Sequence, residues 1–172
     1  ALELEVGTAD VNAWYAEREG TTAVNYGATV GHIPVRAGVM NDAGGWLPEG
    51  DGAHREATDV EIGEMAAAVR DGLEQGALGV GFGVMYTPAA SRWEVLEMFQ
   101  VAARYGASCH IHMRGHGHRD GGGGVDALEE ALAAAVITGA PLHVVHIAST
   151  ALGSLWRLLQ MIGEARDRGI DV

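Results

Sequence analysis

The 172-residue sequence predicts an α/β fold with a parallel sheet, for three reasons. Short apolar runs, typical of buried strands, alternate with longer stretches in which apolar residues recur at helical spacing. Two of the apolar runs also end in histidine. Glycine separates each helical stretch from the next apolar run at intervals of 30, 33 and 30 residues, at Gly76, Gly106, Gly139 and Gly169. Such glycines are common C-terminal helix caps, and the repeat favours right-handed strand-helix-strand units.

Local signals place each element. A β-rich run over 22–30 is the first predicted strand, and the stretch 33–57, rich in Gly, Pro and Asp, is expected to be a long loop. Thr58–Glu61 and Ser91–Glu94 have the capping-box pattern, so a helix should begin at each. Further strands are expected over 77–83, 107–114 and 141–147 and from residue 170, with helices that end at Gly139 and Gly169.

This order of elements favours part of a (β/α)8 TIM barrel, with about four βα units. The alternative is a dinucleotide-binding fold, but Gly79–Gly83 lacks the G-x-G-x-x-G spacing and lies within a predicted strand. A closed barrel has eight strands and typically about 250 residues. We therefore expect residues 1–172 to be part of a single barrel domain that is incomplete at both ends.

Composition excludes several functions. The net charge is −12 and all eleven basic residues are arginine, so nucleic acid and anionic membrane surfaces are not expected partners. The absence of lysine rules out a Schiff-base or phosphate-loop lysine in this chain. The single cysteine, Cys109, is expected to be buried and inert, which suits the cytoplasm. No signal peptide or membrane span is expected.

The two histidines at predicted strand ends, His112 and His146, are candidate metal ligands. Neighbouring parallel strands would bring both imidazoles to the same edge of the sheet, where barrel enzymes place their active sites. Each of them could instead be a hydrogen-bonded core histidine.

Several short motifs resemble one family. They are Val30-Gly31-His32, Gly76–Val80 followed by Tyr86-Thr87-Pro88, His112-Met113-Arg114 and Val145-His146-Ile147. In this order they are similar to the N-acyl-D-amino-acid deacylase (D-aminoacylase) branch of the amidohydrolase superfamily over nearly the whole chain. The resemblance implies that the chain covers the third to sixth barrel strands.

The resemblance also implies a function. His112 and His146 would bind zinc, as one or two divalent ions, in an enzyme that hydrolyses the C–N amide bond of a small N-acyl amino acid. The first-strand His-x-His, the second-strand cysteine ligand and the eighth-strand catalytic aspartate of the family would lie outside the chain. The segment by itself is therefore expected to be inactive.

Three residues are candidates for binding substrate: Tyr86, Arg114 and Ser149. Arg114 could bind a substrate carboxylate or pair with an acid such as Asp120. The family typically has a lysine two residues after the sixth-strand histidine, where this sequence has Ala148. The substrate could therefore be a cyclic amide instead of an N-acyl amino acid.

The remaining histidines are expected to have other roles. His110 shares a strand face with His112 but should lie one layer deeper, and His143 should point toward the helices. His32 is expected to orient a metal-binding side chain and not to bind the metal itself. His116 and His118 lie in the glycine-rich stretch after Arg114, where they could be solvated or bind a second metal.

Two other functions remain open. The chain could be a non-catalytic half-barrel remnant or interaction module, which should dimerise or aggregate through its open sheet edges. It could also belong to a barrel phosphoesterase that uses the same histidine pair. The sequence does not indicate an oligomeric state.

Overall fold

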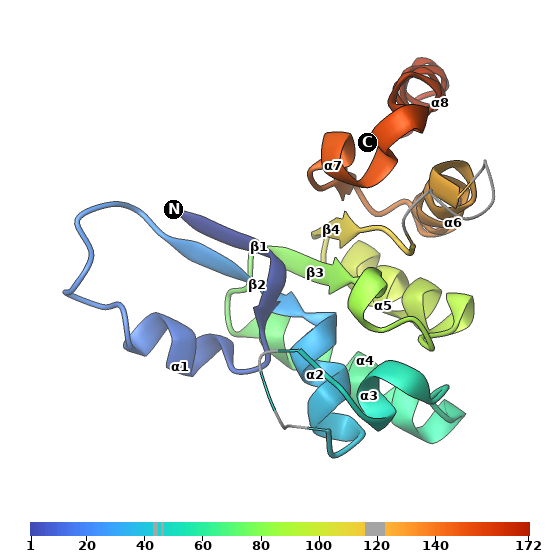
Figure 1. Ribbon diagram of the computed structural model, residues 1–172. Helices are drawn as coiled ribbons and strands as arrows, with labels where there is room; N and C mark the ends of the chain where they lie inside the picture. Colours follow the sequence, from blue (N-terminus) through green and yellow to red (C-terminus); the bar gives the residue numbers. More distant parts are fainter. Residues whose placement is uncertain (43–44, 46, 116–122) are drawn as a thin grey trace.

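The computed structural model describes residues 1–42, 45, 47–115 and 123–172. Its centre is one sheet in which every pair of neighbouring strands is parallel (Figure 1). The strands lie in chain order: β1 (Leu2–Thr8), β2 (Gly27–Gly31), β3 (Gly79–Gly83), β4 (Ser108–His112) and β5 (Leu142–Val144). The predicted α/β class is confirmed, and sequential parallel strands are consistent with part of a barrel.

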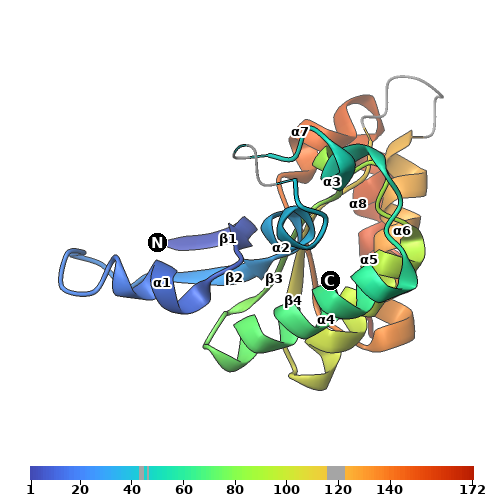
Figure 2. The same ribbon diagram turned by 90° about the horizontal axis from the view of Figure 1, so that it is seen from below.

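Helices connect the strands and cover one face of the sheet (Figures 1 and 2). Helix α4 packs on β2 and β3, α5 on β3 and β4, and α6 on β5. The helices are α1 (Val11–Ala16), α2 (His32–Val39), α3 (Asp51–His54), α4 (Asp59–Glu74), α5 (Arg92–Arg104), α6 (Gly123–Thr138), α7 (Ile147–Ala151) and α8 (Leu155–Asp167), with short 3-10 turns η1 (Val84–Tyr86) and η2 (Leu152–Ser154). Across the described residues, we find no helix both long and apolar enough to cross a membrane.

The helix ends agree largely with the sequence analysis. Gly76, Gly106, Gly139 and Gly169 all have positive φ, between 62° and 98°, as C-terminal caps require. Thr58 and Glu61 form the predicted capping box at the start of α4. Ser91 caps α5 by accepting a hydrogen bond from the Glu94 backbone, but the Glu94 side chain is buried against other partners. The second capping box is therefore only half formed.

Three predicted elements differ in the structure. Strand β1 was not predicted, because its side chains are exposed or half-buried and give no apolar run. The strand expected over 22–30 begins only at Gly27, and the expected loop 33–57 contains most of α2 and all of α3. No strand forms from residue 170, although the Leu142 backbone N–H donates to the Asp171 carbonyl at 2.8 Å. The described residues thus contain five strands, with one more at the start than expected.

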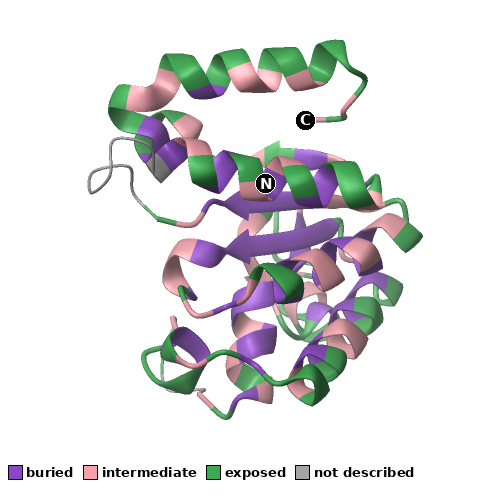
Figure 3. Ribbon diagram, turned by 90° about the vertical axis from the view of Figure 1, so that its right-hand side faces the viewer, coloured by how far each residue is buried: buried purple, intermediate pink, exposed green. Residues whose placement is uncertain are grey.

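The strands separate a helix-facing side from an inner side. Val80 and Phe82 of β3 are fully buried in the apolar core. Figure 3 shows strands of the sheet in purple, the colour of buried residues. Because side chains alternate along a strand, Gly79, Gly81 and Gly83 face the other side. On β4 the same alternation puts Cys109 and Ile111 in the core and His110 and His112 on the inner side. The candidate ligands therefore lie away from the helices.

Candidate metal centre

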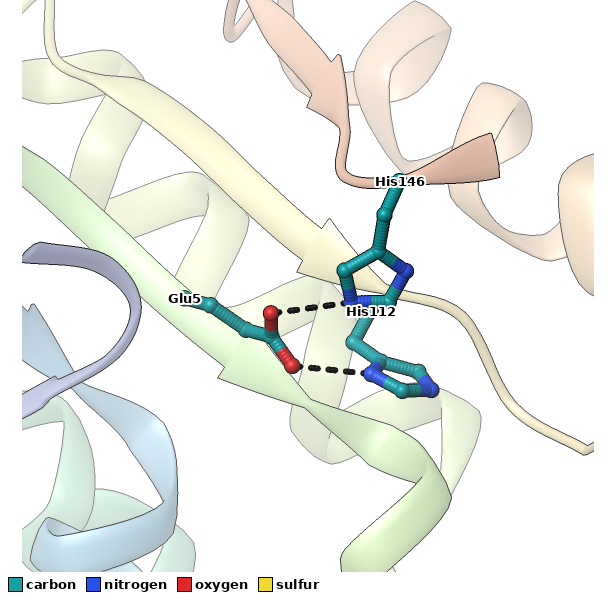
Figure 4. Close-up of side chains that lie close together, drawn as sticks. All are labelled: Glu5, His112 and His146. Carbon is teal, nitrogen blue, oxygen red and sulfur yellow. Dashed lines mark hydrogen bonds and ion pairs between the residues drawn. The ribbon is translucent and has the colours of Figure 1, made fainter. Parts of the chain in front are cut away.

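Two of the expected site residues come together with a third that was not expected. His112 is the last residue of β4, His146 lies two residues beyond the end of β5, and Glu5 lies within β1. One ligand atom from each lies within 4.8 Å of the other two. Figure 4 shows the Glu5 carboxylate facing both imidazole rings, with one oxygen directed toward each. This is a convergent set of metal-ligand type side chains from two strands and from the segment that follows a third.

The contacts within this set are short. Glu5 Oε1 accepts a hydrogen bond from His112 Nδ1 at 2.8 Å, and Oε2 accepts one from His146 Nε2 at 2.9 Å. The two rings are nearly perpendicular, with centroids 4.5 Å apart. The His112 side chain is 7% exposed, whereas that of His146 is 40% exposed. The cluster is therefore buried at His112 and accessible to solvent at His146.

Glycines allow β1 to approach the rest of the sheet. A Cβ atom at Gly31 would lie 1.9 Å from the Val6 carbonyl oxygen, and one at Gly81 would lie 2.5 Å from the Glu5 carbonyl oxygen. The pairing of β1 with β2 also shifts register between Glu3 and Thr8, as at a β-bulge. Bulges often redirect a side chain next to a functional site. The close approach and the shift together place Glu5 beside His112.

The donor set fits a zinc ion. Two imidazoles and one carboxylate are a ligand set of catalytic zinc sites, which leave a fourth position for water or substrate. The metal-facing atoms here are His112 Nδ1, His146 Nε2 and the Glu5 carboxylate. The histidines also lie at or beyond the C-terminal ends of parallel strands, as in barrel enzymes.

Glu5 was missed by the sequence analysis, which placed any ligand from the preceding strand outside the chain. If β4 and β5 are the fifth and sixth strands, β1 takes the second position. The residue that faces the histidines there is a glutamate, where the resemblance implied a cysteine. A signal was present, because Leu2, Leu4 and Val6 alternate with Glu3 and Glu5.

Two of the three substrate-binding candidates contact the histidines. The Tyr86 ring, in η1, meets the His112 ring edge-on, with centroids 5.1 Å apart. Ser149, in α7, has its hydroxyl 3.1 Å from His146 Nδ1. Both residues therefore border the cluster.

The third candidate, Arg114, is held by protein groups. Its guanidinium donates to both carboxylate oxygens of Glu130, at 2.8 and 2.9 Å, and to the carbonyls of Pro88 and Ala90, each at 2.8 Å. Asp120, the acid considered as its partner, lies outside the described residues. In this structure Arg114 joins the segment after β3 to α6.

His110 and His143 form a separate pair. Their Nδ1 atoms are 3.0 Å apart, and Ser108 Oγ lies 2.9 Å from His110 Nε2. Burial and then the neighbouring His143 lower the pKa of His110 to about 4. The expectation that His143 faces the helices is wrong, because it is exposed and pairs with His110 on the inner side. His146 lies beyond the strand, so alternation counted from it does not apply.

His32 has a different environment from the one expected. Its Nε2 donates to Glu94 at 2.6 Å, and Glu94 also accepts from Arg36, with all three side chains fully buried. Burial alone would raise the pKa of Glu94, but the hydrogen bonds and charges of His32 and Arg36 lower it below its ordinary value. The network joins α2 to α5.

Cys109 is buried, and burial raises the pKa of its thiol, in agreement with an inert role. His116 and His118 lie outside the described residues.

Known proteins similar to the chain were found by sequence and by structure, although no family model matches it. A D-aminoacylase of Alcaligenes xylosoxydans xylosoxydans is 34% identical over 117 residues, which are 67% of this chain and 21% of that protein. The chain thus spans about a fifth of the length of this curated relative.

Solved structures give the same result. A crystal structure described as a D-aminoacylase that defines a novel subset of amidohydrolases matches 87% of this chain and 30% of its own, with a TM-score of 0.69 and 32% identity. The N-acyl-D-glutamate deacylase of Bordetella bronchiseptica, complexed with zinc and a phosphonate inhibitor, matches 95% of this chain and 33% of its own, with a TM-score of 0.72 and 26% identity. In sequence and in fold, the chain is therefore similar to a segment of the D-aminoacylase-type amidohydrolases.

Proposed function

We propose that a protein containing this chain is a zinc-dependent amidohydrolase that hydrolyses the C–N amide bond of an N-acyl amino acid. The observation that carries the proposal is the Glu5 carboxylate hydrogen-bonded to both His112, at the end of β4, and His146, just beyond the end of β5. Similarity to D-aminoacylase and to a zinc-containing deacylase supports it. We also propose that residues 1–172 are part of one larger barrel domain, because the chain matches only about a third of each similar structure.

In this proposal, Glu5, His112 and His146 hold the zinc ion. Bound zinc supplies a Lewis acid that polarises an amide carbonyl and lowers the pKa of water toward neutrality. Glu5 adds a negative charge that favours cation binding. His112, on a buried strand end against Tyr86, holds its side of the site rigid. The aspartate expected to move the proton lies outside this chain.

Three residues around the cluster support a proposal for substrate binding. Tyr86 forms a wall beside His112, where an acyl group could pack. Arg114 is occupied by Glu130 and two carbonyls, and Ala148 stands where the family has lysine. We infer that this segment holds the metal and the acyl part of the substrate, whereas another part of the protein binds the carboxylate.

Metal binding by the chain tests the proposal directly. Zinc stoichiometry would be measured by equilibrium dialysis and metal analysis on the wild type, a His112→Ala, His146→Ala double variant and a His54→Ala control. His54 is an exposed histidine in α3 and is not a member of the cluster. We expect the double variant to lose the bound zinc and the control to keep it. Full zinc retention in the double variant would contradict the proposal.

The substrate class needs the whole protein. It would be assayed, with zinc, against N-acyl-D-amino acids, the matching L-isomers and cyclic imides. Hydrolysis of the D-series would support the proposal. Preference for the cyclic imides would support zinc-dependent hydrolysis but would show that the proposed substrate class is wrong. A zinc-free protein that forms a stable dimer would favour the non-catalytic module.

A further inference from the structure

Ser149 contacts the imidazole of His146 on the side opposite Glu5. We infer that Ser149 is a positioning residue that fixes the tautomer of His146, so that Nε2 is presented to the metal. The inference rests on the proposed zinc site. It gives Ser149 a role different from the substrate contact expected from the sequence.

Two short contacts join Ser149 to His146. Ser149 Oγ lies 2.9 Å from the His146 carbonyl oxygen and 3.1 Å from His146 Nδ1. A hydroxyl has one proton to donate, and a carbonyl can only accept. When the Ser149 proton is donated to the carbonyl, the lone pairs of Oγ remain for the ring and favour the tautomer that carries its proton on Nδ1.

That tautomer is the one that leaves Nε2 available. A histidine binds a metal through a nitrogen without a proton, and its other N–H usually donates to a carbonyl, carboxylate or water that orients the ring. Here Nε2 already faces Glu5 at 2.9 Å. In the tautomer that donates Nδ1–H to Ser149, Nε2 is the unprotonated nitrogen that would bind the metal.

Ser149 also holds the backbone of His146. His146 has φ 33° and ψ 47°, a left-handed conformation that is uncommon for a residue other than glycine. Its carbonyl accepts from the Ser149 backbone N–H at 2.9 Å as well as from the hydroxyl. One residue therefore ties both the backbone and the ring of His146 in a 40% exposed position that packing alone would not fix.

Thr150 provides a matched control. It is the next residue in α7 and also has a hydroxyl bonded to a backbone carbonyl, that of Ile147 at 3.3 Å. Its hydroxyl makes a local helix contact of the same kind without a ring partner. Loss of this hydroxyl should affect α7 but not the tautomer of His146.

Zinc affinity would be measured by competition with a chelator for the wild type, Ser149→Ala, Ser149→Thr and Thr150→Val. Removing an outer partner of a ligating histidine typically weakens metal binding 10–100-fold. We expect about that loss in Ser149→Ala, near-full recovery in Ser149→Thr, and a change of less than about twofold in Thr150→Val. The zinc-loaded wild type should show, by 15N NMR of the imidazole, a protonated Nδ1 on His146.

The outcomes separate this inference from the proposed function. If the wild type binds zinc and Ser149→Ala binds it equally well, the role of Ser149 is wrong and the metal site stands. A proton on Nε2 of His146 in the zinc-loaded protein would also overturn it. If the wild type does not bind zinc, both the proposed function and this inference fail.

Discussion

The Glu5 carboxylate accepts a 2.8 Å hydrogen bond from His112 Nδ1, although the two residues are 107 positions apart in the sequence. The bond joins β1, the first strand of the sheet, to β4, the fourth. The second Glu5 oxygen accepts a hydrogen bond from His146 Nε2. One carboxylate therefore holds the candidate metal centre together.

Replacing Glu5 by glutamine should abolish most metal binding. The amide keeps the size of the side chain but removes the charge and one acceptor oxygen. Removing a residue that only orients a metal ligand weakens metal binding by up to about 100-fold. Because Glu5 would bind the metal itself, we expect a larger loss of zinc affinity. Titration calorimetry would measure it, with Glu3→Gln as a control on the same strand. Similar affinities for the two variants would show that Glu5 is not a ligand.

A side chain at Gly81 should displace β1. The Cβ of Gly81→Ala would lie 2.5 Å from the Glu5 carbonyl oxygen and 2.6 Å from Thr29 Oγ1, so the backbone must move. Zinc affinity should fall together with stability. Gly63→Ala, exposed within α4 with no atom near the added Cβ, should instead stabilise the protein by about 0.5–1 kcal/mol. Denaturant unfolding and zinc titration of both variants would check this, and an unchanged Gly81→Ala would contradict the close approach.

Arg114→Lys should destabilise the protein because an ammonium cannot reproduce the four hydrogen bonds of the planar guanidinium. Hydrogen bonds to charged groups contribute about 1.5–3 kcal/mol, so we expect a loss in this range in urea unfolding. Arg92→Lys is the control, because Arg92 is 74% exposed and lies 3.8 Å from the same Glu130. If Arg114→Lys leaves stability unchanged but weakens substrate binding in the whole protein, Arg114 binds substrate after all.

Glu94→Gln should be more damaging. It removes the counter-charge of Arg36, which is fully buried, and breaking a buried pair costs about 3–5 kcal/mol. Glu97→Gln, one turn later in α5 and only half-buried, should change stability by about 0.5 kcal/mol or less. Thermal and urea unfolding would compare the two. Equal effects would mean that the network does not stabilise the fold.

The stability contribution of Glu61 should depend on pH. Hydrogen bonds from Arg55 and then from Thr58 lower the pKa of Glu61 to about 2 from an ordinary value near 4.5. A lowered folded-state pKa gives stability that is present above pH 4.5 and is lost as pH falls toward 2. The difference in unfolding free energy between wild type and Glu61→Gln should therefore shrink from pH 6 to pH 3. A constant difference across this range would contradict the assignment.

The sequence alone determined the repeating architecture. Helical spacing, the Thr58 capping box and four C-terminal glycines are local signals, and the structure confirms the helices and caps that they predict. It also identified His112 as the end of a strand, because an apolar run that stops at a histidine is visible without knowledge of the fold. The strand expected to end with His146 stops at Val144, two residues earlier.

Only the tertiary structure decided which side chains meet. The side chains of β1 are exposed or half-buried, so its pairing with β2 and its approach to β3 depend on backbone contacts and on glycines far along the chain. The same holds for Arg114, whose partner Glu130 lies 16 residues away on α6. Hydrogen bonds between distant residues leave no periodic trace in a sequence, and for this reason Glu5 became a candidate ligand only once the sheet was assembled.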